Sequence, residues 1–429
     1  MINNNPANIN VLYIKREIEK TIQPVLDRKE VIAIIGPRQA GKTTLLQNLK
    51  KRLMGEYKTV KFITFEKRSE LALFQSNLED FKDLYKNYQI VIIDEFQYAK
   101  DGGAKLKYLY DTTDTKFIIS GSSSLELTFQ TGKYMVGRIF NFILLPFSFR
   151  EFLSYADVEL FNLIQERIPD IFSPDFKLDH AFGDEINRRL ENLFEDYLIW
   201  GGYPAVVLAK TQTEKQKILE SILENYLLRD IGSLLQLATE DELITLIKFL
   251  STQIGNLVEY KELSNASKLS YKELLKHINI LRQTYIVDLI KPYFSNVRTE
   301  LTKNPKAYFM DSGLRNLAIM DFKSCDMRSD RGSLVENFVF SSLKRRLAPF
   351  DSLNFWRTKS KAEIDFVFKA GKDIIPIEVK YTNAPTIGKS VYSFINKFSS
   401  PELFILTKNF VFEHKVRNCK IKFLPVYYL

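Results

Sequence analysis

The stretch that decides the fold is residues 31–46, VIAIIGPRQAGKTTLL. Its apolar first five residues predict a buried strand, and a helical pattern follows the glycines. The residues between them match G-x-x-x-x-G-K-[ST] at Gly36, Gly41, Lys42 and Thr43. Glycines let successive backbone N–H groups turn toward phosphate oxygens, a lysine reaches the β- and γ-phosphates, and a threonine hydroxyl holds a magnesium ion. The stretch therefore predicts a phosphate-binding loop, with an ordinary glycine turn at a helix start as the alternative.

The whole loop is expected to surround the nucleotide. We predict that ATP contacts the following run of residues: Gly36, Pro37, Arg38, Gln39, Ala40, Gly41, Lys42, Thr43 and Thr44.

Composition bounds the kind of protein. A chain of 429 residues with 45% hydrophobic residues has enough apolar surface for two to four domains with ordinary cores. It carries 61 Lys and Arg against 52 Asp and Glu, a formal net charge of +9. This surplus favours anionic partners, and nucleotides, nucleic acids and anionic membranes all meet that description.

The scarce residue types exclude some classes of site. Neither a disulfide framework nor a zinc cluster is visible, because the cysteines and histidines stand far apart: Cys325, Cys419, His180, His277 and His414. A reducing cytoplasm is the simplest location. The first 20 residues have no apolar signal core, and the longest apolar stretch, IFNFILLPFSF, is interrupted by Asn141 and Pro146. We therefore expect no membrane span.

Two carboxylates follow the next strongly apolar segment. The stretch QIVIIDE, residues 89–95, predicts a strand that ends at Asp94 and Glu95. Both carboxylates would lie beside the phosphate-binding loop if the two strands were neighbours in a parallel sheet. Asp94 would then bind Mg²⁺ together with Thr43, and Glu95 would orient or deprotonate the attacking water. An acidic pair that starts a helix is the alternative.

Two further residues are candidates for phosphate chemistry. The stretch KFIISGSSS, residues 116–124, predicts a strand that ends in hydroxyls, and Ser120 or Ser122 could contact the γ-phosphate or the lytic water. A serine- and glycine-rich turn is the alternative. Arg138 could stabilise transition-state charge in the same chain or from a neighbouring subunit. Its alternative is a surface ion pair.

At this point the chain resembles a known family. The segments GPRQAGKTTLL, IIDEFQ, IISGSSSLEL and GRIFNFILLPFSFREF look like the predicted ATPases of bacteria and archaea in the AAA+ superfamily that carry a C-terminal domain of unknown function. The likeness continues through WGGYP, NYLLRDI, YFMDSGL and GSLVENFV. It implies an α/β fold with a parallel-sheet P-loop ATPase domain over residues 1–150, and ATP as the nucleotide, but no known substrate.

The middle of the chain is expected to hold two helical blocks. Residues 151–236 are helical and charged and predict a lid or linker, with a packing spacer as the alternative. Residues 237–295 predict three helices followed by a β-hairpin arm in YIVDLIKPYF, which together make a winged helix. This domain would contact DNA or serve as a packing or oligomer domain.

The third of these helices has the side chains of a DNA reader. Ser270 and Glu273 form a capping-box signature at its start. Its apolar face is expected to comprise Leu274, Ile278 and Leu281, and its polar positions Lys272, Lys276, Asn279 and Arg282. Cationic and amide groups of this kind contact phosphates and base edges, although a lysine-bearing face is also commonly just solvated.

Residues 296–429 carry a second acidic pattern. In AEIDFVF and DIIPIEVKYT, strand alternation puts Glu378 and Lys380 on one face, and Asp365 lies in the preceding strand. Two carboxylates and a lysine in this order resemble the PD-(D/E)xK nuclease superfamily, which also draws a glutamate from a preceding helix. Glu336 is placed for that role, so Glu336, Asp365 and Glu378 are candidate magnesium ligands. An exposed ion pair between Glu378 and Lys380 is the alternative.

The sequence thus predicts ATP hydrolysis with Mg²⁺, coupled to DNA binding or processing through the C-terminal half. A non-cutting, ATP-dependent switch with an inactive nuclease-like domain, acting on a protein or DNA partner, is the alternative. A homo-oligomer is compatible with either.

Overall fold

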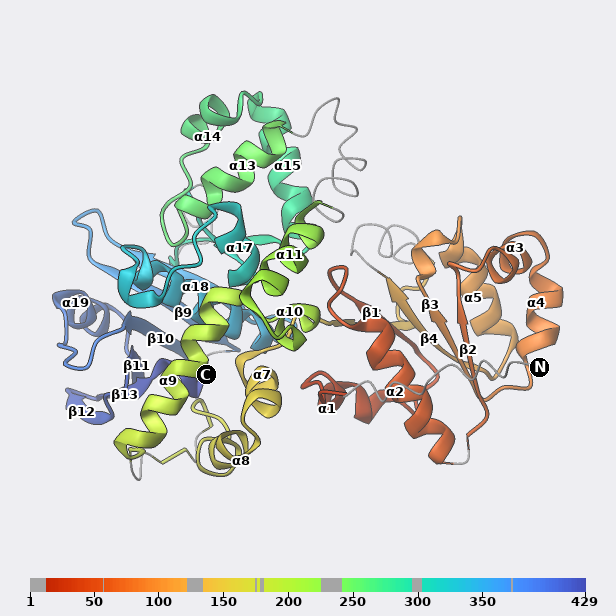
Figure 1. The fold of residues 1–429 in the computed structure, drawn as a ribbon, viewed down its shortest axis with the longest axis horizontal. Helices are drawn as coiled ribbons and strands as arrows, with labels where there is room; N and C mark the ends of the chain where they lie inside the picture. The colour runs from red at the N-terminus through yellow and green to blue at the C-terminus, as the bar shows by residue number, and fades with distance from the viewer. Residues whose placement is uncertain are drawn as a thin grey trace. The chain divides into compact units, whose positions relative to one another are not determined.

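The computed structural model describes residues 13–56, 58–121, 134–173, 176–177, 181–224, 241–294, 303–371 and 373–429. Ser122 and the NYLLRDI segment lie outside this described part of the chain. The chain divides into two compact units, residues 1–36 with 41–144 (unit 1) and residues 37–40 with 145–429 (unit 2) (Figure 1). Among the described residues, no helix combines the length and the apolar character that crossing a membrane requires.

Unit 1 is built on a five-stranded parallel sheet. Its strands stand in the order β2-β3-β4-β1-β5, and all four pairings are parallel. Their bounds are β1 Val31–Ile35, β2 Val60–Thr64, β3 Ile90–Asp94, β4 Lys116–Gly121 and β5 Ile139–Ile143. Our placement of the two carboxylates required β1 and β3 to be neighbours. They are not neighbours, because β4 lies between them. The carboxyl ends of all five strands still share one edge of the sheet.

Five α-helices of unit 1 are described: α1 Glu19–Ile22, α2 Lys42–Gly55, α3 Arg68–Ser76, α4 Leu78–Tyr85 and α5 Gly102–Thr112 (Figure 1). The helix α2 begins inside the glycine-rich motif and buries Leu45, Leu46, Leu49 and Leu53 against the sheet. This burial fixes the helix N-terminus at the end of β1. The N-terminus of α2 is therefore held where the sequence predicts the phosphates.

Unit 2 begins with a helical layer. Its helices are α7 Phe149–Ala156, α8 Val158–Arg167, α9 Asp184–Trp200, α10 Pro204–Leu208 and α11 Gln212–Ile222. The helices pack on the C-terminal part of the chain: Phe149 and Phe194 contact Phe338 edge-on, and Arg150 donates to the Tyr428 carbonyl at 2.9 Å. The helices α7 and α9 thus share a core with the C-terminal part of the chain.

Three helices and a two-stranded sheet follow. They are α13 Asp241–Thr252, α14 Tyr260–Ser267 and α15 Tyr271–Gln283, then β6 Val287–Ile290 paired antiparallel with β7 Lys306–Phe309. The strand β7 comes from outside the range 237–295 that we expected for this block. The arm is therefore formed by two strands far apart in sequence. The tight hairpin that we predicted within YIVDLIKPYF is wrong in this respect.

The last sheet has six strands in the order β12-β13-β11-β10-β9-β8. Their bounds are β8 Ser352–Arg357, β9 Glu363–Ala370, β10 Asp373–Lys380, β11 Glu402–Thr407, β12 Phe412–Val416 and β13 Cys419–Pro425, and the helices nearby are α17 Ser312–Ala318, α18 Arg331–Arg346 and α19 Lys389–Lys397. β8, β9 and β10 are antiparallel, whereas β10, β11 and β13 are parallel. The helix α18 contacts β9, β10 and β7.

A buried carboxylate joins two of the motifs noted in the sequence. Asp311, in YFMDSGL, accepts hydrogen bonds from the backbone N–H of Gly202 at 2.8 Å and of Leu314 at 3.0 Å. Gly201, in WGGYP, has φ +77°, and a Cβ there would overlap the Asp311 carboxylate. Gly201 is therefore required by its backbone conformation and by the close approach of Asp311, whereas a Cβ at Gly202 would overlap the Phe147 carbonyl.

We predict that Gly201→Ala destabilises unit 2 by at least about 2 kcal/mol, because a side chain must enter left-handed backbone and displace Asp311. Gly332→Ala is the matched control, since a Cβ there meets nothing within 4 Å. Both tryptophans of the chain, Trp200 and Trp356, lie in unit 2, so tryptophan fluorescence in a urea titration reports this unit alone. Equal midpoints for the two variants would contradict the prediction.

Candidate functional site

The phosphate-binding loop has the local geometry that its sequence predicts. Gly41 has φ +93° and precedes the first residue of α2, and Gln39 also has a positive φ of 60°. A Cβ at Gly36 would overlap the Leu144 carbonyl, because the chain beyond β5 runs against this residue. The Lys42 ammonium folds back and donates to the Gly36 carbonyl at 3.0 Å. The loop thus brings a buried lysine and a helix N-terminus together.

Asp94 connects this loop to the neighbouring strands. The Thr43 hydroxyl donates to Asp94 Oδ2 at 2.7 Å, and the Ser120 hydroxyl donates to Asp94 Oδ1. Asp94 is almost completely buried, so both carboxylate oxygens have partners where an unpaired one would be costly. Although β4 separates β1 from β3, the three predicted side chains meet because their strands end at one edge.

Ser120 differs from what the sequence suggested. It is fully buried, and besides its bond to Asp94 it accepts from the Glu95 backbone N–H at 3.1 Å. Its hydroxyl is therefore committed to the acidic pair rather than open to a γ-phosphate. Glu95 itself has φ +56°, and its side chain accepts from Gln97.

Arg138 is not near the loop of its own chain. It immediately precedes β5, its carbonyl accepts from Val31 N–H at the start of β1, and its guanidinium binds Asp111 at 3.2 Å. The loop follows the opposite end of β1. The predicted action of Arg138 on the phosphates of the same chain therefore conflicts with the structure, and the ion-pair alternative is observed.

Thr43 and Asp94 suit a magnesium ion bound with nucleotide. Mg²⁺ prefers hard oxygen ligands and commonly takes one or two from protein and the others from phosphate and water. The hydroxyl and the carboxylate lie within one hydrogen bond of each other at the helix N-terminus. These residues therefore fit the ion that the motif implies.

The second candidate site lies on β9, β10 and α18. β9 and β10 form the expected hairpin, with Ile377 opposite Phe366, so that one step further Glu378 is opposite Asp365. Asp365 Oδ2 accepts from the Val379 N–H at 2.8 Å, and Lys380 binds Glu378 at 2.7 Å. Hairpin and helix thus bring Glu336, Asp365 and Glu378 close enough to influence one another's ionisation.

Sequence reasoning missed three members of this cluster. Lys306 on β7 is 2% exposed and binds Glu336 at 3.2 Å and Glu363 at 2.6 Å. Tyr308, two residues later, donates its hydroxyl to Glu336. A signal existed in KAYF, because alternate positions of a strand share one face and an otherwise apolar strand carries a lysine.

The charges in the cluster perturb its titration. Burial, reinforced by the Asp365 charge, raises the pKa of Glu336 to about 7 and that of Glu378 to about 8. Burial also raises the pKa of Asp365. Burial alone would lower the pKa of Lys306, but the nearby carboxylates outweigh it and raise that pKa, so Lys306 is charged.

The cluster does not have the form of a three-ligand metal centre. Across the described ranges, no group of three or more histidine, cysteine, aspartate or glutamate side chains is arranged to hold a metal ion. Glu336, our candidate ligand from the helix, is occupied by Lys306 and Tyr308. The residues present therefore do not fit the magnesium site predicted from Glu336, Asp365 and Glu378.

The helix α15 has the predicted distribution of side chains. The capping box of Ser270 and Glu273 is confirmed. The expected apolar residues are buried and the expected polar residues exposed: Leu274, Ile278 and Leu281 against Lys272, Lys276, Asn279 and Arg282. Arg282, however, binds Asp288 at 2.8 Å.

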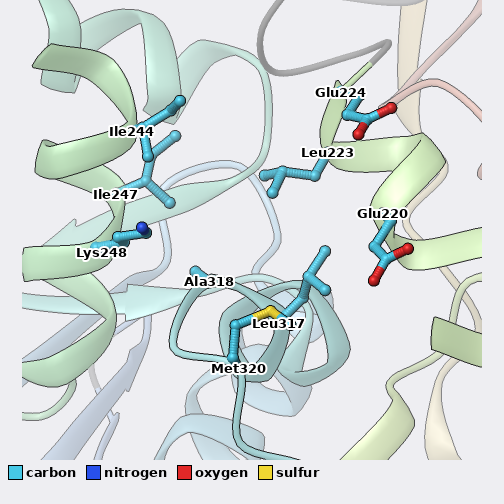
Figure 2. Close-up of a pocket in the computed structure, with 9 residues that line it drawn as sticks. All are labelled: Glu220, Leu223, Glu224, Ile244, Ile247, Lys248, Leu317, Ala318 and Met320. Atoms are coloured by element: carbon cyan, nitrogen blue, oxygen red, sulfur yellow. The ribbon is translucent and has the colours of Figure 1, made fainter. Parts of the chain in front are cut away.

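A further cavity of about 230 Å³ lies among α11, α13 and α17. Figure 2 shows Glu220 and Glu224 on one side of it and Lys248 on the other, with an apolar floor that includes Leu317 and Met320. None of its nine lining residues, all of which the structure describes, is a serine, cysteine or histidine. The carboxylate cluster is therefore the stronger candidate for chemistry in unit 2.

Family comparisons divide the chain in three. Residues 28–153 match the AAA domain, residues 191–324 match a domain of unknown function (DUF8612), and residues 331–428 match another domain of unknown function (DUF4143). The first match supports the predicted AAA+ ATPase domain. The other two carry no stated activity.

Similar proteins include an uncharacterized protein of Mycobacterium tuberculosis, 26% identical over 396 residues, which are 90% of this chain and 78% of the relative. An uncharacterized protein of Haemophilus influenzae is 24% identical over 381 residues, 85% of this chain and 86% of that protein. Among solved structures, AMPPCP-bound DnaA from Aquifex aeolicus matches with 13% identity, 63% and 89% coverage of the two chains and a TM-score of 0.29. The Aeropyrum pernix ORC1 protein in complex with DNA matches with 12% identity, 73% and 95% coverage and a TM-score of 0.31.

The raised pKa of Glu378 predicts a pH-dependent stability. The folded protein holds this proton up to about pH 8, whereas the unfolded chain releases it near pH 4.5. The contribution of Glu378 to the free energy of unfolding is therefore fully present below pH 4.5 and is lost as the pH rises to 8. We expect Glu378→Gln, which stays neutral, to flatten this fall by a few kcal/mol, as an order of magnitude.

The measurement is the urea midpoint of unit 2, followed by tryptophan fluorescence from pH 5 to 9. Glu402→Gln is a suitable control, because this glutamate lies outside the cluster in the same sheet and binds Lys422. A wild-type midpoint that rises across this pH range, with Glu378→Gln unchanged from wild type, would refute the assignment.

Proposed function

We propose that the protein binds and hydrolyses ATP with Mg²⁺ in unit 1, and that the nucleotide state governs how unit 2 engages DNA. The observation that carries the proposal is the hydrogen bond from Thr43 to Asp94 at the N-terminus of α2. It joins the phosphate-binding loop to the acidic end of β3. The match of residues 28–153 to the AAA domain supports the same reading.

Each residue of the loop has a distinct task in this proposal. The Lys42 ammonium exchanges the Gly36 carbonyl for the β- and γ-phosphates, and backbone N–H groups at the start of α2 bind phosphate oxygens. Thr43 and Asp94 hold Mg²⁺, which neutralises phosphate charge when bound. The Ser120 hydroxyl donates to the Asp94 carboxylate and keeps it in position.

Glu95 is the proposed base that orients the attacking water. It follows Asp94 directly, at the carboxyl edge of the sheet where the loop also lies. Its left-handed backbone conformation turns the chain sharply after β3. A residue other than glycine adopts this conformation at a cost of about 1 kcal/mol or more, which is consistent with a functional position. Arg138 has no such role within one chain, and a role in trans requires a homo-oligomer.

We predict that Glu95→Gln retains ATP binding and loses about 100-fold or more in turnover, because the amide cannot accept the proton of the water. Lys42→Ala should lose binding as well as turnover. The measurements are equilibrium binding of a fluorescent ATP analogue and steady-state phosphate release. Glu66→Gln is the matched control, since Glu66 is an exposed acid that follows the carboxyl end of β2.

If Lys42→Ala binds and turns over ATP as wild type does, the loop is not the nucleotide site. If Glu95→Gln keeps full turnover, another group positions the water.

For DNA, the proposal rests on α13, α14 and α15 with the β6–β7 pair, which we interpret as a winged helix. The helix α15 buries its apolar face, and it exposes Lys272, Lys276 and Asn279. Lysines at such a surface contact phosphates, and an asparagine can contact base edges. The formal net charge of +9 favours the same partner.

The order of α18, β8, β9, β10, α19 and β11 supports the restriction-nuclease-like fold predicted for residues 296–429, although β7 of this range pairs with β6. Helix, antiparallel strands and a parallel strand succeed one another, with Asp365 and Glu378 opposite each other on the hairpin. A non-cutting switch is the second candidate function, and it is favoured by the occupation of Glu336 by Lys306. We therefore expect the protein to bind DNA without cleaving it.

We predict that Lys272→Ala with Lys276→Ala weakens DNA binding and reduces the slope of log affinity against log salt by about two, because two phosphate contacts are lost. Lys217→Ala on α11, an exposed lysine elsewhere in unit 2, is the control. Fluorescence anisotropy with linear, circular and single-stranded DNA, with and without ATP, gives the measurement. An unchanged salt slope would exclude α15 from the interface.

The same samples, run on a gel with Mg²⁺, separate the two candidates. Cleavage that Asp365→Ala removes would establish a nuclease. Intact DNA, from a preparation that hydrolyses ATP and binds DNA in an ATP-dependent manner, would establish the switch.

A further inference from the structure

A lysine occupies the carboxylate cluster of unit 2. Lys306 enters from β7, and its ammonium binds Glu336 Oε1 at 3.2 Å and Glu363 Oε1 at 2.6 Å. Only 2% of this residue is exposed. A buried ammonium is stable only when its charge is paired and its protons are hydrogen-bonded. Lys306 and the two glutamates are therefore mutually dependent.

The carboxylate of Glu336 is also enclosed. The Tyr308 hydroxyl donates to the same oxygen that Lys306 binds. On another side stands Gly255, where an added Cβ would lie 3.2 Å from both carboxylate oxygens. The N–H of Gly255 donates to the Ala307 carbonyl at 3.1 Å, which keeps the loop after α13 against β7. The strand β7 and the loop after α13 thus close around one carboxylate.

The second carboxylate that Lys306 binds is compensated as well. Arg357 on β8 binds the other oxygen of Glu363 at 3.1 Å. The hairpin side of the cluster has its own cation, because Lys380 binds Glu378. Every glutamate of the cluster therefore has a cationic side chain against it.

This arrangement opposes a divalent metal ion. A metal ion on Glu336 would share its oxygen ligand with the Lys306 ammonium, and two cations that share a ligand in a buried site repel each other strongly. Two carboxylates already pair with the charge of Lys306, so its side chain need not move toward bulk solvent. The protein supplies as a side chain the charge that a metal would supply.

We propose that Lys306 is the resident cation of this cluster and holds the place in which a divalent metal ion would neutralise Glu336 and Glu363. The lysine thereby closes the cluster to metal ions and fixes β7 to α18. Lys306 and its partners all lie in unit 2, and none of them belongs to the phosphate-binding loop.

The experiment is a titration of nucleotide-free, full-length protein with Mn²⁺, followed by the electron paramagnetic resonance signal of the free ion. We expect Lys306→Met, which keeps most of the side-chain volume, to bind one Mn²⁺ at least about tenfold more tightly than wild type, a gain of about 1.4 kcal/mol. Adding Glu336→Gln should remove the gain. Lys422→Met is the matched control, because Lys422 on β13 is another buried strand lysine of unit 2, and it binds Glu402 at 2.8 Å.

Two outcomes would overturn the proposal. One is a folded Lys306→Met variant that binds Mn²⁺ no more tightly than wild type. The other is a wild-type protein that already binds Mn²⁺ tightly and loses it with Glu336→Gln.

The second outcome can be tested even if Lys306→Met does not fold, because it needs wild type and a Glu336 variant only. The double variant Lys306→Met with Glu336→Gln removes both charges of the pair, a change that buried ion pairs often tolerate. Its fold is checked by tryptophan fluorescence. Failure of ATP turnover would leave each of these readings unchanged, so the two proposals are tested separately.

Discussion

A carboxylate removed from water needs a partner for its charge and for its oxygens, and the candidate sites of both units depend on this constraint. In unit 1, the Asp94 carboxylate meets it with two hydroxyls, from Thr43 at the start of α2 and from Ser120 on β4. The same bonds that satisfy the acid fix three elements at one edge of the sheet. The phosphate-binding loop is thus fixed next to the carboxyl end of β3. A loop that is already ordered loses little conformational entropy when it binds a ligand.

Unit 2 meets the constraint in two ways with different consequences. Asp311 is satisfied by backbone N–H groups, which are neutral and fixed, so its role is to join the Gly201–Gly202 turn to the start of α17. Glu336 is satisfied instead by a charged side chain, the ammonium of Lys306, together with the hydroxyl of Tyr308. The pKa of Glu336 is raised to about 7 and that of Glu378 to about 8, so the charge of this cluster changes near neutral pH.

Local patterns predicted what depends on local chemistry. The loop geometry at Gly41, the strand before it, the capping box at Ser270 and the hairpin of Asp365 and Glu378 each follow from a short run of residues. What the sequence did not predict is pairing between distant segments. No pattern near residue 90 indicates that β4 separates β1 from β3. Similarly, Lys306 is one of many lysines until β7 pairs with β6 and carries it beneath α18.

The contacts of β6 link the candidate DNA surface to the carboxylate cluster. Asp288 on β6 binds Arg282 of α15 at 2.8 Å and Lys344 of α18 at 2.7 Å. Glu336, bound to Lys306, lies on the same α18 about 12 Å along its axis from Lys344, at 1.5 Å per residue. The helix α18 is thus bound to β6 through Lys344 and to β7 through Glu336, so one helix connects the carboxylate that pairs with α15 to the carboxylate that pairs with Lys306.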